Sequence, residues 1–85
     1  MSSRLSVEIA KLAARTRHLR IEDHDALNEL NIVVGYAYLL HFHPECREKL
    51  RKHLEAFSDF ACIRGHLELY EHAAKIIEIM HGSGR

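Results

Sequence analysis

Two histidines and a cysteine stand close together in the segment HFHPEC at residues 41–46. Imidazole nitrogens and thiolates are preferred zinc ligands, and a structural zinc site takes four ligands in a tetrahedron. The candidate ligands are His41, His43 and Cys46, with Cys62 or His66 as a fourth. Their spacing matches no standard zinc pattern. A zinc site is therefore the alternative interpretation of this segment, and no other cofactor is expected.

A reactive thiol is a second interpretation of Cys46. If Pro44 opens a helix, Cys46 lies in its first turn, where the positive end of the helix dipole favours a thiolate. Neighbouring glutamates oppose that effect, and a buried cysteine usually behaves as a small hydrophobe. We therefore expect this segment to be a corner between two helices, with His41 facing the core and His43 capping the next helix.

Nothing in the chain combines residues in a catalytic pattern. The sequence has no Ser/His/Asp order, no glycine-rich phosphate loop and no pair of carboxylates placed for acid–base chemistry. In the last quarter of the chain, His72 follows Glu68 by four residues, which predicts a surface pair on one helix. We therefore expect a protein without enzymatic activity.

The composition describes one small, electrically balanced domain over residues 1–85. Its 12 Lys and Arg residues equal its 12 Asp and Glu residues, so no net charge attracts nucleic acid. A small DNA-binding regulator is kept as an alternative because basic residues gather near the N-terminus and in the segment CREKLRKHLE at residues 46–55. The longest apolar run, 32–40, is far shorter than a membrane span. With two cysteines and no export signal, we expect a cytoplasmic protein without a membrane partner.

Charge is unevenly distributed along the first third of the chain. A basic patch precedes an acidic segment at 22–29. The patch consists of Lys11, Arg15, Arg17 and Arg20. The ordinary interpretation is solvated helix faces with local ion pairs. The other interpretation is a basic surface that meets an acidic partner, such as the acidic segment of a second copy. The eight histidines would add positive charge to the chain below pH 7.

Apolar residues recur every three or four positions, and the chain has one proline. This pattern predicts an all-α fold, a compact bundle of three to four helices joined as antiparallel hairpins. The predicted helices cover residues 3–20, 24–42, 44–58 and 60–81. The apolar phase slips between 57 and 63, which indicates a break capped by Ser58 or Asp59. One long kinked helix is the alternative.

Each predicted helix carries one apolar stripe that we expect to face the core. In chain order, the stripes are Leu5, Ile9, Leu12, Thr16 and Leu19; Leu27, Leu30, Val34, Ala37 and His41; Cys46, Leu50, Leu54 and Phe57; and Ile63, Leu67, Tyr70, Ala74, Ile77 and His81. The second helix is apolar nearly all round from 30 to 40, so it is either central or part of an interface. Gly35 in its middle predicts the close approach of a neighbouring backbone.

The core of a bundle of this size cannot bury all the apolar residues of the chain. The remaining apolar residues predict a surface that binds another protein. The candidate contact residues are Tyr36, Tyr38, Phe42, Phe60 and Tyr70, with an apolar edge of Ile76, Ile79 and Met80. Aromatic side chains supply much of the binding energy when they lie in interfaces. We therefore expect an interaction module of the adaptor, co-chaperone or inhibitor type. It would act on another protein and self-associate as a dimer.

Overall fold

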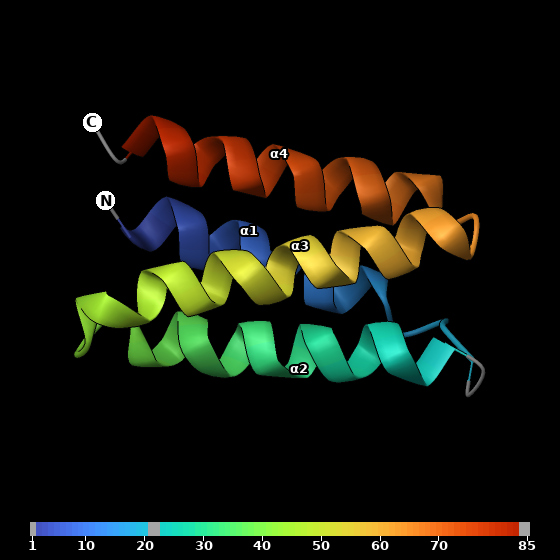
Figure 1. The fold of residues 1–85 in the computed structure, drawn as a ribbon, viewed down its shortest axis with the longest axis horizontal. Coiled ribbons are helices and arrows are strands. Elements are labelled where there is room, and N and C mark those ends of the chain that lie inside the picture. The colour runs from blue at the N-terminus through green and yellow to red at the C-terminus, as the bar shows by residue number, and fades with distance from the viewer. Residues whose placement is uncertain (1, 21–22, 84–85) are drawn as a thin grey trace.

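The computed structural model describes residues 2–20 and 23–83, which fold into four α-helices (Figure 1). The α-helices are α1 (Ser2–Arg15), α2 (His24–Leu39), α3 (Arg47–Ile63) and α4 (Leu67–Ser83). A short 3-10 helix, η2 (Pro44–Cys46), leads into α3. No strand occurs within the described residues, and the predicted all-α bundle is confirmed.

Successive helices run in opposite directions, with α2 packed along α3 and α3 along α4 (Figure 1). The first helix, α1, lies against α2 and α4 and across the bundle from α3. It has fewer contacts with its two neighbours than α3 has with its own. Two of the four seams, α2–α3 and α3–α4, are therefore closely packed, while the α1–α2 and α1–α4 seams are more open.

One apolar stripe from each helix fills the centre of the bundle. Phe57, Leu50 and Leu54 of α3 are fully buried there. The other core residues are Leu5, Ile9 and Leu12 of α1, Ala26, Leu30, Val33 and Ala37 of α2, Ala61 of α3, and Leu69, Ala73, Ile76 and Met80 of α4. Spacings of three and four residues place each set on one side of its helix. The predictions for α1 and for Leu50, Leu54 and Phe57 are thus confirmed.

The predicted stripe of α4 was wrong, and that of α2 was correct only in part, because Leu30 and Ala37 are buried but Val34 and His41 are exposed. On α2, Val34 is 42% exposed, whereas its neighbour Val33 is completely buried. On the last helix the predicted stripe began with Ile63, which is 78% exposed and belongs to the end of α3. The core face of α4 instead includes Ile76, which is completely buried. Both helices are apolar on more than one side, so residue spacing alone is compatible with two different core-facing stripes. The packing of the neighbouring helices decides which of the two stripes is buried.

The first helix ends at Arg15, before the predicted boundary at residue 20. The hydroxyl of Thr16 donates to the carbonyl oxygen of Ala13 at 2.7 Å, and the Thr16 amide donates to the same oxygen at 3.2 Å. A threonine that bonds the backbone in this way competes with the regular helical pattern. The chain turns here, yet Thr16 is buried and Leu19 packs against the core.

The break between α3 and α4 lies at residues 64–66, beyond the predicted break at 58–60. Gly65 has a positive φ of 81°. The amide of Gly65 donates to the Cys62 carbonyl, and the amide of His66 donates to the Ala61 carbonyl. These two bonds are the Schellman ending of a helix, which favours glycine at the left-handed position. Ser58 and Asp59, the predicted caps, both lie inside α3.

Among the described residues, no helix combines the length and the apolar character needed to cross a membrane.

Candidate protein-binding groove

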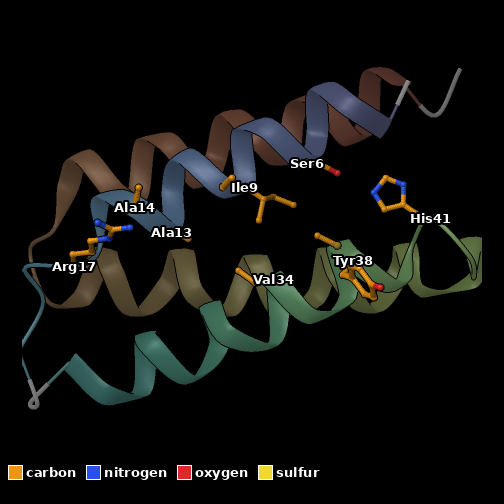
Figure 2. A pocket seen from close by; sticks show the side chains of 10 residues that line it. Ser6, Ile9, Ala13, Ala14, Arg17, Val34, Tyr38 and His41 are labelled. Carbon is orange, nitrogen blue, oxygen red and sulfur yellow. The ribbon is translucent and has the colours of Figure 1, made fainter.

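An apolar groove runs between α1 and α2 and has a volume of about 510 Å³ (Figure 2). Ala10, Ala13 and Ala14 line it from α1, and Val34 and Ala37 line it from α2. Alanine side chains end at Cβ, so they cannot fill the space between two neighbouring helices. The open α1–α2 seam is therefore a direct result of small residues on this side of α1.

The arginine and the histidine that line the groove lie at its two ends. Arg17 lies at one end and His41 at the other (Figure 2). None of the groove-lining side chains in the described part of the chain is acidic. Within residues 2–20 and 23–83, no carboxylate forms an ion pair with Arg17 or His41. The groove thus combines an apolar floor with an electropositive end at Arg17.

The predicted basic patch does not form one surface. Lys11 lies 3.6 Å from a carboxylate oxygen of Glu8, and Arg15 lies 3.3 Å from one of Glu68 on α4. These two cations are therefore paired on the α4 side of α1. Arg17 lines the groove on the other side. Arg20 is exposed beyond α1, in the segment that leads to α2.

The acidic residues that follow the patch are largely paired within the chain. Asp23 lies 3.2 Å from Nε2 of His66, and its other carboxylate oxygen accepts a hydrogen bond from the Arg20 amide. Asp25 lies 3.3 Å from Arg64. Glu29 of α2 lies 2.7 Å from Nδ1 of His53 on α3; Glu22 is outside the described residues. These contacts hold helices together, so these three carboxylates are not free to meet a second copy.

Two exposed aromatic side chains adjoin the His41 end of the groove. Tyr38 is 68% exposed and Phe42 is 65% exposed, and their ring centres lie 5.9 Å apart in an edge-on arrangement. The Phe42 ring also lies edge-on to His41 at 6.5 Å. Tyr38 and His41 themselves line the groove, so the aromatic pair extends its apolar surface.

The other predicted contact residues are scattered over the molecule. Tyr36 stacks on His53 with ring centres 5.7 Å apart, and Phe60 packs against the core. Tyr70 is exposed on α4 and Ile79 is half-buried there. Ile76 and Met80 belong to the core. These last two residues are therefore removed from the predicted contact surface.

The HFHPEC segment forms a corner in which its candidate ligands lie apart. His41 is exposed, which corrects the prediction that it faces the core. His43 is exposed and its Nδ1 lies 3.3 Å from a carboxylate oxygen of Glu45. Cys46 is half-buried in η2, where Pro44 takes the opening position. The described residues hold no group of three or more His, Cys, Asp or Glu side chains arranged for a metal ion.

A polar cluster between α1 and α4 could not be predicted from local spacing. His72 was expected to pair with Glu68 on the surface, but its side chain is only 9% exposed. Its Nε2 lies 3.0 Å from Glu8 Oε1, and its Nδ1 lies 3.0 Å from Arg15 Nη1. Because arginine can only donate and a carboxylate can only accept, the neutral tautomer with the proton on Nε2 satisfies both contacts.

The same cluster shifts the titration of Glu8. The hydrogen bond from His72 is the main cause that lowers the pKa of Glu8, and the positive charge of Lys11 adds to it. Hydrogen bonding to a carboxylate favours its charged form. The cluster thus holds α1, which forms one wall of the groove, against α4.

No family model, curated protein or solved structure matches this chain.

Proposed function

We propose that this chain is a protein-interaction module that binds an amphipathic helix of another protein in the α1–α2 groove. The observation that supports the proposal is the groove itself, whose apolar lining includes Arg17 and His41 and, among the described residues, no acidic side chain. Apolar grooves between helices are a common site for the apolar face of a partner helix. The role is binding, without catalysis.

The length of the groove suits a short helix. Its lining on α1 runs from Ser6 to Ala14, about 12 Å along the helix axis, and continues to Arg17 in the turn that follows α1. A partner helix of about three turns would cover this distance. Large apolar side chains from such a helix would fill the space above Ala10, Ala13 and Ala14, where the chain's own side chains are too small.

The charges favour a different protein over a second copy as the occupant. In a symmetric pair of copies, the groove lining of one would face the groove lining of the other, with Arg17 and no carboxylate on either side. The acidic residues Asp23, Asp25 and Glu29 already have partners within the chain. A helix that contributes its own negative charge therefore complements this surface better.

The proposal includes a reducing compartment such as the cytoplasm. Cys46 and Cys62 are both free thiols, and Cys62 is exposed. Exposed free thiols persist where the environment keeps cysteine reduced.

Peptide display tests the proposal. The probe is a library of randomised peptides of about 16 residues on a neutral helical frame, long enough to form isolated helices. Peptides enriched on the wild-type protein are labelled with fluorescein and titrated by fluorescence polarisation. We expect amphipathic sequences whose affinity falls about tenfold on Ala14→Leu, because the larger side chain occupies the groove. The matched control Lys52→Leu adds the same side chain to the exposed side of α3.

Three outcomes would overturn the proposal. The first is a selection that enriches no amphipathic peptide. The second is equal binding of the enriched peptides to wild type and Ala14→Leu. The third is a dimer, detected by light scattering at micromolar concentration, that Ala14→Leu dissociates. That result would place a second copy in the groove.

A further inference from the structure

We infer that the groove selects partner helices that carry a carboxylate about three turns away from a large apolar residue. The carboxylate meets Arg17, and the apolar residue packs against Tyr38 and Phe42. This inference rests on the proposed function, because it names the chemistry of the helix that the groove would bind. It follows from the two unlike ends of the groove.

Arg17 forms the electropositive end. It is exposed, lines the groove and has no carboxylate partner within the described residues. Its guanidinium can bind a carboxylate through two parallel hydrogen bonds, which fixes direction as well as charge. The neighbouring cation Arg15 is held by Glu68 and His72 on the α4 side of α1. Arg17 is therefore the arginine at this end of α1 that is placed for a ligand in the groove.

Tyr38 and Phe42 form the apolar end. Both rings are about two-thirds exposed, and they meet edge-on rather than packing into the core. Exposed aromatic rings of this kind contribute strongly when a partner covers them, because they bury a large area and lose few rotamers. His41 stands beside them and adds no acidic group. A large apolar side chain is the complement of this end.

The run of groove-lining residues from Ser6, near the Tyr38 end, to Arg17 sets the spacing of the motif (Figure 2). At 3.6 residues per turn, three turns of helix contain about 11 residues, and residues 11 positions apart lie on the same face. The partner helix therefore carries a large apolar residue and Asp or Glu about 11 positions apart. Further apolar residues between them, at spacings of three and four, lie over the alanines of α1.

Parallel selections test the inference. The same neutral-frame library is selected on wild type, on Arg17→Glu and on the matched control Arg4→Glu. Arg4 is exposed near the start of α1 and lies outside the groove, so its reversal makes the same change in net charge. We expect Asp or Glu at the motif position in the wild-type and Arg4→Glu pools, and Lys or Arg at that position in the Arg17→Glu pool.

Titration of single peptides gives the magnitude. A wild-type-selected peptide should lose about three- to tenfold in affinity on Arg17→Glu, since an exposed ion pair is weak and its reversal adds repulsion. Replacing its motif carboxylate with lysine should restore affinity for Arg17→Glu. The inference would be overturned if the peptides selected on wild type and those selected on Arg17→Glu carried the same charge at the motif position. If Ala14→Leu still lowers the affinity of those peptides about tenfold, the proposed function stands; if it does not, both fail.

Discussion

Nε2 of His72 lies 3.0 Å from Oε1 of Glu8 and links α4 to α1 across 64 positions of sequence. Nδ1 of the same ring lies 3.0 Å from Arg15, so one imidazole connects two residues of α1 to α4. Three histidines act in this way. His53 joins α3 to Glu29 of α2, and His66, just before α4, pairs with Asp23, just before α2. Part of the unusual histidine content of the chain thus serves to hold helices together.

Removing the His72 side chain should destabilise the docking of α1. We expect His72→Ala to cost about 1–3 kcal/mol of unfolding free energy, because Glu8 loses its partner in a part-buried hydrogen bond and a largely buried side chain is removed. His72→Gln keeps one donor and one acceptor and should lose less. Urea denaturation followed by circular dichroism measures both values. His18→Ala, at an exposed position, is the control; equal effects at the two positions would contradict this role.

Acid should destabilise the fold through Glu8 and Asp23. Hydrogen bonds from His72 and His66, respectively, are the main causes that lower the pKa of these carboxyls in the folded chain. A carboxyl with a lower pKa in the folded state stabilises the fold above its ordinary pKa, and this contribution is lost as the pH falls through the folded pKa. We therefore expect the melting temperature to fall most steeply below about pH 4.

Thermal melts between pH 5 and pH 3 measure this effect. Glu8→Gln removes one of the two carboxyls and should flatten the dependence of the melting temperature on pH. Asp59→Asn changes an exposed carboxyl on α3 and should leave the dependence close to that of the wild type. If the melting temperature of Glu8→Gln depends on pH as steeply as that of the wild type, the contact between Glu8 and His72 makes no pH-dependent contribution to stability.

Two glycine-to-alanine substitutions should change stability in opposite directions. Gly65 has a φ of 81°, so Gly65→Ala should cost about 1–2 kcal/mol even though nothing lies within 4 Å of the added methyl group. Gly35 lies inside α2 with the same open surroundings, which corrects the predicted close approach of a backbone. Gly35→Ala should stabilise the protein by about 1 kcal/mol through helix propensity. Chemical denaturation of both variants gives the two signs.

Two isoleucine-to-alanine substitutions test the assignment of the core. Ile76 is completely buried, whereas Ile63 is 78% exposed. Ile76→Ala should cost about 2–5 kcal/mol, because it leaves a cavity in the centre of the bundle. Ile63→Ala should change the unfolding free energy by less than about 0.5 kcal/mol. A larger loss for Ile63→Ala than for Ile76→Ala would instead support the apolar stripe predicted from the sequence, which begins at Ile63.

The sequence predicts best where a helix has one apolar side. On α1 and α3, small or polar residues occupy most of the remaining positions, so the stripe through Leu5 and Ile9 and the stripe through Leu50 and Leu54 have a single phase. On α2 and α4, apolar residues occupy adjacent positions such as Val33 and Val34. There, the inward residue is decided by the neighbouring helices, which a local pattern does not include.

The binding groove was only partly accessible to prediction from sequence. Tyr38 and Phe42 were named as contact residues, and the structure places them exposed beside the groove. The groove itself depends on small residues in α1, such as Ala10 and Ala14, and on the position of α2 opposite them. Each alanine alone is an ordinary helical residue. Their effect arises only when α1 and α2 pack side by side.

The position of α1 between α2 and α4 has a consequence for the growing chain. Leu5, Ile9 and Leu12 leave the ribosome before either covering helix exists, and His72, which holds Glu8, follows 64 positions later. At synthesis rates of about 5–20 residues per second, the apolar side of α1 remains uncovered by α4 for several seconds. The hairpins of α2, α3 and α4 need no residue of α1 to pair with one another. The contact between α1 and α4 can therefore form only after α4 has been made.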